Sequence, residues 1–488
     1  MSRLLPLALP ALLLTGCDLG PDYHRPALDV PAAFQATPAS AAAAWPAPDW
    51  WRGFGSPELD ELIRRARLYD NNLLAAVARV QQADAQVRIA GAPLLPSLTG
   101  SGNATYERVG TGSGRGGSGF VTTPSGTVTS VSSGGGSHYT DVHNYGAQLN
   151  VAYEADFWGK NRANFESAQA AALASRFDQE TVALTVVTSV ATTYLSALGF
   201  DDELRVAQQN LAAAEDILKV NQAMLAVGTA SALDVAQQEA LVEGLRAVIP
   251  GLRSQRDQEV IGLGILTGLP PEHIAIRPGT LIDMPAPDVA PGLPSTLLAR
   301  RPDVAFAEAE LISQNGSVRA ARAAFFPDVQ LTGAAGWQSA ALSSLISPGS
   351  ALLSIAGNAT QTIFDNGNLL GQFELQKGRY QELVADYREA VLQAFTDVED
   401  ALTGLRFAIE QERLQAGAVA AARRALDVAR AQLAAGTANM ITVLTAEQTL
   451  FSDEATLAED RLARFQALIT LYKALGGGWS LPGAGSRT

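Results

Sequence analysis

Few side chains in this sequence have the types and spacing that enzyme chemistry needs. The four histidines are His24, His138, His143 and His273. No two of them have the helical spacing of a metal-ligand pair, and no Gly-x-Ser-x-Gly or phosphate-binding loop is present. Gly112, Gly114 and Gly117 have dinucleotide-loop spacing, but no buried strand precedes them and no helix follows. We therefore expect no enzyme activity, no metal and no cofactor.

Cys17, the only cysteine, has surroundings that predict a covalent modification. The apolar run before it, residues 4–14, is too short to span a bilayer as a helix. The letters LTGC that end at Cys17 resemble the lipobox of bacterial lipoproteins, in which the cysteine becomes the first residue and carries acyl chains. We expect a signal peptide over 1–16, lipidation of Cys17 and an extended segment over 17–55. A buried free cysteine is the alternative.

The charge balance and the apolar runs limit the possible partners. Across 488 residues, 35 Lys and Arg stand against 49 Asp and Glu, a formal net charge of −14, so no nucleic-acid partner is expected. After Gly16 there is no run of 18 or more apolar residues, so we expect no transmembrane helix. If the chain crosses a membrane, it must do so as a closed β-barrel, which satisfies every backbone polar group in lipid.

The sequence is internally duplicated. LAVGTASALDVAQQE at 225–239 is repeated as LAAGTANMITVLTAE at 433–447, with Gly228 aligned to Gly436 at an offset of 208. A repeat of this kind predicts two similar structural units. The expected segments are a first unit over 56–267, a linker over 268–300, a second unit over 301–475 and a tail over 476–488.

Four segments alternate apolar and polar residues, which is typical of strands with one face in lipid. These segments are 97–107, 143–154, 328–338 and 353–364. In the second segment, the residues expected to face lipid are Tyr145, Leu149, Val151 and Tyr153. The Gly/Ser-rich residues 108–141 predict an exposed loop. A half-buried sheet in a soluble protein would give the same alternation.

Two long helical patterns each end at a glycine. The four helical segments are 159–227, 232–267, 367–435 and 440–475. Leucines seven residues apart in the long segments predict coiled-coil packing. We expect two helical hairpins that turn at Gly228-Thr229 and Gly436-Thr437, because glycine permits a tight reversal. We also expect Pro250 to interrupt the first return helix and one helix to cover 56–92. A soluble coiled-coil rod is the alternative.

Several motifs together resemble a known family. They are GPDYHRP at 20–26, Trp50-Trp51, YEADFWG at 153–159, RPDV at 301–304, IFDNG at 363–367 and YKALGGGW at 472–479. The chain resembles the outer-membrane efflux factor family of TolC/OprM-like channels, in its lipoprotein (NodT) branch. The resemblance implies a mainly α fold with a membrane β-barrel. In a homotrimer, each subunit would give four strands to one twelve-stranded barrel and its helices to a long periplasmic coiled-coil α-barrel.

The resemblance also implies a function. The protein would be the passive outer-membrane exit duct of a tripartite pump for drugs and other toxic compounds. Its partners would be a periplasmic adaptor (membrane fusion) protein and an inner-membrane resistance-nodulation-division pump. A duct for protein or oligosaccharide export is one alternative. A non-porous, lipid-anchored periplasmic scaffold is another.

The hairpin tips are the expected docking and gating site. The candidate residues are Gly228, Thr229, Asp234, Gly436, Thr437 and Thr442. Family members often carry tyrosine three residues before the tip glycine, where this chain has Leu225 and Leu433. They often carry aspartate at the position of Thr442. We therefore expect a less acidic gate in which Asp234 attracts cations.

Overall fold

The structure is a computed structural model that describes residues 20, 22–28, 30–34, 45–111, 119–122, 128–131, 138–287 and 294–480. Cys17 and the expected signal peptide lie outside the described residues. The chain divides into two compact units, of which unit 1 comprises 1–22, 86–168 and 314–378, and unit 2 comprises 23–85, 169–313 and 379–488. Each unit thus draws segments from both halves of the duplicated sequence.

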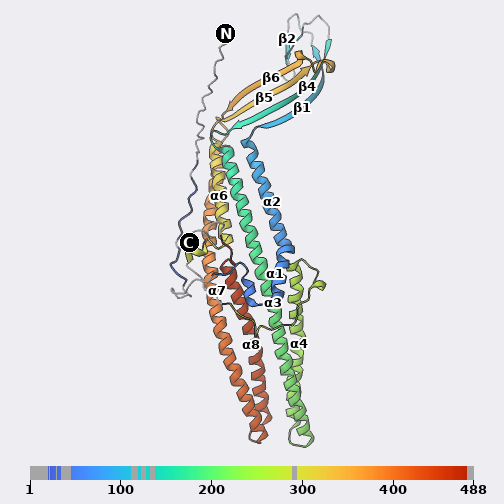
Figure 1. The fold of residues 1–488 in the computed structure, drawn as a ribbon, viewed down its shortest axis with the longest axis vertical. Coiled ribbons are helices and arrows are strands. Elements are labelled where there is room, and N and C mark those ends of the chain that lie inside the picture. Colours follow the sequence, from blue (N-terminus) through green and yellow to red (C-terminus); the bar gives the residue numbers. More distant parts are fainter. Residues whose placement is uncertain are drawn as a thin grey trace. The chain divides into compact units, whose positions relative to one another are not determined.

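Unit 1 contains a four-stranded antiparallel sheet with the order β1-β4-β5-β6 (Figure 1). Its strands are β1 (Ser97–Thr111), β4 (His138–Ala155), β5 (Asp328–Ser339) and β6 (Ala351–Thr360). Two short strands, β2 (Gly119–Thr122) and β3 (Val128–Val131), form a separate two-stranded sheet.

The strand ends differ from those expected from the sequence. β1 and β4 continue to pair beyond the end of β5, and Arg108 there binds Asp141 across the two strands at 2.7 Å. Parts of the expected loop 108–141 are therefore strand. β6 ends at Thr360 rather than at 364, because its partner β5 begins only after Pro327, which has no N–H to donate.

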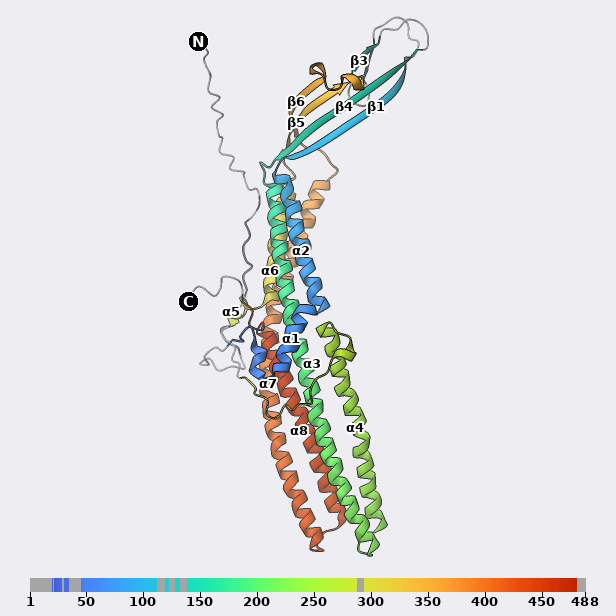
Figure 2. The ribbon, with the colours of Figure 1, turned by 45° about the vertical axis from the view of Figure 1, so that its right-hand side comes forward.

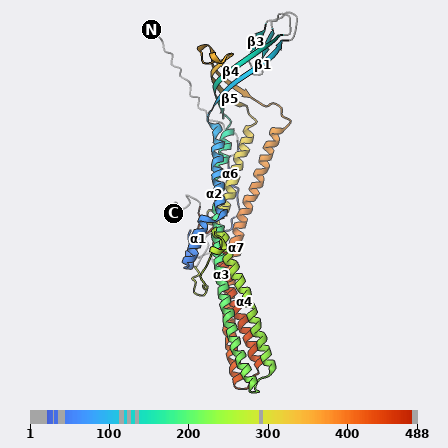
Figure 3. The same cartoon turned by 90° about the vertical axis from the view of Figure 1, so that its right-hand side faces the viewer.

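The helices are α1 (Pro57–Tyr69), α2 (Asn71–Gly91), α3 (Lys160–Ala226), α4 (Ala232–Thr267), α5 (Pro294–Leu297), α6 (Pro302–Ala323), α7 (Asn368–Ala434) and α8 (Met440–Ala474). In unit 2, α3 with α4 and α7 with α8 form two antiparallel hairpins that turn at the same end (Figures 1 and 2). A further view shows the two hairpins packed together along this end (Figure 3).

Two helical expectations are wrong in detail. The expected helix over 56–92 is two helices, because extended Asp70 accepts the Leu73 N–H at 2.9 Å and starts α2. Pro250 does not interrupt α4, whose neighbouring Ile249 is buried in the packing. Among the described residues, α3 alone is long and apolar enough, by length and composition, to cross a membrane: an 18-residue window has mean hydropathy 1.5, and 61% of that window is buried. Its apolar side chains lie in the core of unit 2.

An aromatic core in unit 2 joins the segment before α1 to α8. Trp50 stacks on Tyr472 with ring centroids 4.5 Å apart, and Phe54 lies 6.0 Å from Phe465. Trp50 and Phe54 stand in the segment before α1, and Phe465 and Tyr472 belong to α8. Gly477, next to α8, has φ 57 and leaves no room for a side chain against Leu184. The residues after α8 are thus fixed against α3.

Candidate functional site

The two faces of the sheet differ in chemistry. Partners in an antiparallel register share a face, so the register assigns each residue to a side. One face carries Leu98, Val151, Gly333 and Ile355 in one row and Gly100, Leu149, Ala335 and Leu353 in the next. The row between them, on the opposite face, consists of Thr99, Asn150, Ala334 and Ser354. An apolar face and a more polar face therefore run across all four strands.

The residues that the sequence assigned to lipid share the apolar face. Leu149 and Val151 are 55% and 42% exposed in the single chain. Tyr145 and Tyr153 lie on the same face by alternation along β4. On the other face, the Asn150 side chain donates to the Ser101 hydroxyl at 3.1 Å. This separation suits a sheet with lipid on one side and water on the other.

The two hairpin tips have the same backbone geometry. Gly228 has φ 77 and Gly436 has φ 70, values in the left-handed region that glycine adopts without strain. After each glycine, a threonine closes the last helical turn with both its N–H and its hydroxyl. Thr229 donates to the Met224 carbonyl at 2.9 and 3.1 Å, and Thr437 donates to the Gln432 carbonyl at the same two distances.

The helices that leave the tips start with different caps. Ser231 begins α4 in a capping box, in which the Asp234 carboxylate accepts the Ser231 N–H at 2.9 Å. Asn439 begins α8 by accepting the Thr442 N–H at 3.0 Å. Asp234 thus has a structural partner as well as a charge. The duplicated tips have the same turn but different caps.

A buried polar group lies near the tips and was missed in the sequence analysis. Glu447 of α8 has no exposed surface, and neither does Gln238 of α4. The Arg430 guanidinium binds Glu447 at 3.2 Å, and the Gln238 amide lies 3.4 Å from the same carboxylate. Burial raises the pKa of Glu447, while the bonds from Arg430 and Gln238 act in the opposite direction.

The sequence did contain a signal for this group. Glu447 stands between Val443 and Leu450 in the buried stripe of α8, at a spacing that normally holds apolar residues. Gln238 likewise stands between the buried Val235 and Val242 of α4. A polar residue in an apolar stripe is a sign of a buried polar contact.

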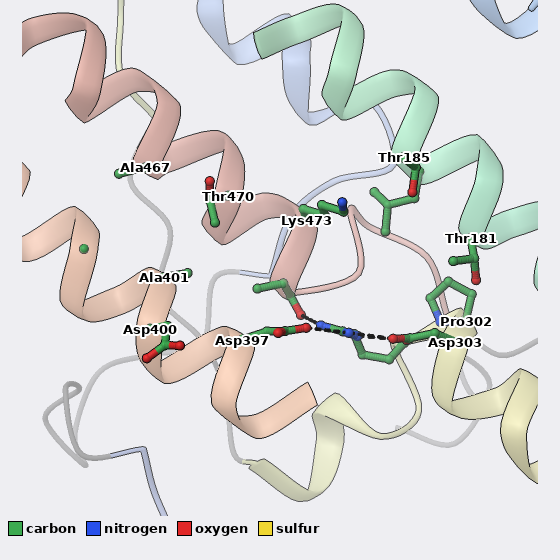
Figure 4. Close-up of a pocket in the computed structure, with 14 residues that line it drawn as sticks. Thr181, Thr185, Pro302, Asp303, Asp397, Asp400, Ala401, Ala467, Thr470 and Lys473 are labelled. Atoms are coloured by element: carbon green, nitrogen blue, oxygen red, sulfur yellow. Dashed lines mark hydrogen bonds and ion pairs between the residues drawn. The ribbon is translucent and has the colours of Figure 1, made fainter. Parts of the chain in front are cut away.

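A cavity of about 510 Å³ lies among α3, α6, α7 and α8 in unit 2. Asp303 and Asp397 approach one guanidinium there, that of Arg301 (Figure 4). The buried Arg301 also donates to the Ala474 carbonyl at 3.0 Å. Because both carboxylates bind the same cation, they join the start of α6 to α7 and α8 rather than form an acid–base pair. Among the described residues, no group of three or more acidic, His or Cys side chains could hold a metal.

The comparisons with known proteins agree with this geometry. The sequence model of the outer membrane efflux protein family matches residues 62–269 and 293–477. OpmQ from Pseudomonas aeruginosa, a pyoverdine export outer membrane protein, is 36% identical over 475 residues, 97% of each chain. TtgC from Pseudomonas putida, a probable efflux pump outer membrane protein, is 32% identical and matches 98% of this chain and 96% of its own.

A solved structure gives the same result for the fold. The open state of the Neisseria gonorrhoeae MtrE outer membrane channel is 27% identical, with a TM-score of 0.82, and the match covers 95% of this chain and 98% of that one. The fold class expected from the sequence is confirmed: a mainly α chain that contributes four strands to a membrane β-barrel and long coiled helices to an α-barrel. The relatives are channel and transport proteins. The chain belongs to the outer membrane efflux protein family and is an exit duct of an efflux system in the outer membrane.

Proposed function

We propose that the duct is a homotrimer that works with a periplasmic adaptor and an inner-membrane pump of the resistance-nodulation-division type. The sheet supports the trimer. Within the described part of the chain, β1 and β6 are paired on one side only, so the sheet has two open edges. An open edge is not tolerated in lipid, where unpaired backbone groups have no water to bind. Copies of the chain remove both edges by pairing β6 of one with β1 of the next.

The two faces of the sheet then separate lipid from lumen. The row of Leu98, Val151 and Ile355 faces outward, and the row of Thr99, Asn150 and Ser354 faces the pore. A polar lumen suits passive conduction of dissolved compounds. The cargo is small organic molecules, and the inner-membrane pump selects among them.

The hairpin tips form the gate and the adaptor contact. The left-handed glycines at 228 and 436 and the threonines after them make tight, reproducible turns that a partner can recognise. Asp234, once per chain, puts three carboxylates around the closed end and attracts cations. Thr442 has no charge at the equivalent position, so the ring is less acidic than one with two carboxylates per chain.

The N-terminus adds a second attachment to the membrane. Acyl chains on Cys17 contribute about 0.8 kcal/mol for each buried CH₂ group, which supports the barrel without replacing it. Further along the chain, Arg25 of unit 2 donates to Glu308 at 2.6 Å. Protein or oligosaccharide export remains the alternative cargo class.

Purified full-length protein in planar lipid bilayers tests the proposal. The expected result is a trimeric mass in detergent and discrete, cation-selective conductance steps. A monomeric protein that never conducts would refute the trimeric duct. Export of a small toxic compound by cells that contain the adaptor and pump, and its loss without them, tests the partners.

The tip assignment has its own test and a matched control. Gly228→Leu with Gly436→Leu forces side chains into positive φ, at about 1–3 kcal/mol each, and should stop export while the trimer still inserts. The control pair is Gly244→Leu with Gly417→Leu, at exposed helical glycines where an added Cβ meets nothing within 4 Å. Full export by the tip variant, or equal loss in the control, would refute the tip assignment.

A further inference from the structure

The two hairpins of one chain share an apolar core above their tips. Its buried residues come from all four helices, for example Ala214 of α3, Val242 of α4, Leu426 of α7 and Val443 of α8. Figures 1–3 show the two hairpins together at this end of unit 2. Apolar contacts have no fixed direction, so this core alone lets the hairpins slide against each other.

A polar layer, made of Gln238, Arg430 and Glu447, lies within this core. The Gln238 amide donates to the Ala214 carbonyl at 3.1 Å and lies 3.4 Å from the Glu447 carboxylate. Arg430 completes the layer from α7 at 3.2 Å. The contacts therefore connect α3, α4, α8 and α7 in one continuous path. The path links one hairpin to the other within the same chain.

The layer resists separation of the hairpins for a simple reason. Glu447 and Gln238 have no exposed surface, so any movement that separates them leaves a carboxylate and an amide in an apolar core. The Gln238 carbonyl oxygen already lacks a protein partner, and so do both polar atoms of the buried Asn221, about two turns further along α3 from Ala214. Further loss of contacts is therefore unfavourable, and each contact requires a particular register of the helices.

The duplication shows that the layer is not a general requirement of the fold. At the offset of 208, the counterpart of Glu447 is Glu239, which is exposed, and the counterpart of Gln238 is Ala446. The layer therefore occurs once per chain. Glu447 stands seven residues after Met440, where α8 begins, which is about 10 Å along the helix.

We propose that the polar layer positions the tip gate: it fixes the two hairpins of each chain in one register, so that the pore opens only when these contacts break or rotate. The inference rests on the proposed gate at the tips. Glu447 and Gln238 are positioning residues, since they act through the helices that carry the tips. A partner that opens the tips must supply enough binding energy to disrupt the layer.

Single-channel recording tests this inference with the full-length protein. Glu447→Ala should raise the open probability about tenfold, equivalent to about 1.4 kcal/mol. Glu447→Gln, which can still accept from Arg430 and Gln238, should restore most of the closed behaviour. The matched control, Glu239→Ala, removes the same side chain from the exposed counterpart position and should leave the open probability unchanged.

A second variant separates gating from stability. Glu447→Leu fills the site with an apolar side chain and should leave the thermal unfolding temperature of the trimer equal or higher. It should nevertheless open the channel as Glu447→Ala does, because the directional contacts are gone. The inference would be overturned if Glu447→Ala and Glu447→Leu both kept the closed state of the wild type, or if Glu239→Ala opened the channel as much as they do. A wild-type protein that forms no channel would instead refute the proposed function.

Discussion

The assignment of one face of the sheet to lipid and the other to the pore is tested most sharply by placing a charge on each face in turn. Val151 belongs to the same row as Ile355, which stands in the middle of β6, the shortest strand of the four-stranded sheet at ten residues. Ten residues at about 3.4 Å, tilted by about 45°, rise about 24 Å, close to the height of the apolar band of an outer-membrane barrel. We therefore expect Val151 to lie near the middle of the bilayer.

The expected penalty follows from this position. Val151→Lys places an ammonium group at the midplane on the lipid side and should lower the free energy of unfolding by about 2–4 kcal/mol per chain. For three chains the sum is about 6–12 kcal/mol, enough to prevent stable insertion of many barrels. Asn150→Lys, one residue away on the other face, should cost less than about 1 kcal/mol and shift the conductance toward anions.

Urea titration of each variant folded into lipid vesicles measures the free energies, and planar bilayers report the selectivity. Ile355→Lys and Ser354→Lys repeat the comparison on β6, where the two residues are again neighbours on opposite faces. If both members of a pair lose the same stability, or if Asn150→Lys is the more harmful, the assignment of faces is refuted.

Three further predictions concern other parts of the chain. Cys17→Ser should abolish acylation, seen as a loss of mass, yet leave the barrel in the membrane fraction; a fully soluble variant would contradict the barrel. Asp234→Asn should reduce cation selectivity while it keeps an acceptor for the Ser231 N–H. Asp234→Ala should also lose about 1 kcal/mol of helix-capping stability. Equal cation selectivity in the wild type and both variants would show that the Asp234 charge has no role in the gate. Burial, with the charges of Glu459 and Asp202, raises the pKa of Glu203 from 4.5 to about 7. The unfolded chain loses this proton first, so stability should fall as the pH rises from about 4.5 to about 7. Glu203→Gln should remove that fall and add about 1 kcal/mol above pH 7, after allowance for screening by solvent; an unchanged profile of melting temperature against pH would contradict the assignment.

The sequence predicted the features that depend on local chemistry. The turns at Gly228 and Gly436 follow from glycine, the helical stripes and the repeat, and the structure has both glycines at positive φ. The alternation along β4 also placed Leu149 and Val151 on one face without any tertiary information.

The features that the sequence did not predict depend on partners far away in the chain. The residues next to Thr360 do not explain the end of β6. The strand ends because its partner β5 begins at Asp328, and Pro327 before it has no N–H to donate. The extension of β1 and β4 into a Gly/Ser-rich segment was hidden by its composition, since two such strands support each other only once paired. Glu447 was visible as a polar residue in an apolar stripe, but its partners Gln238 and Arg430 come from two other helices.

The stacking of Trp50 on Tyr472 has a consequence for biogenesis. Trp50 precedes α1 and Tyr472 belongs to α8, the last helix, and the core around them also takes residues from α3 and α4. The core cannot close until the last helix has left the translocation machinery, because contacts so distant in sequence form late. Until then, the newly exported chain exposes tryptophan and phenylalanine to the periplasm. We therefore expect the N-terminal part, although it emerges first, to need protection from aggregation for longest. A chain truncated within α8 should be degraded rather than assembled, even though every strand of the sheet is already present.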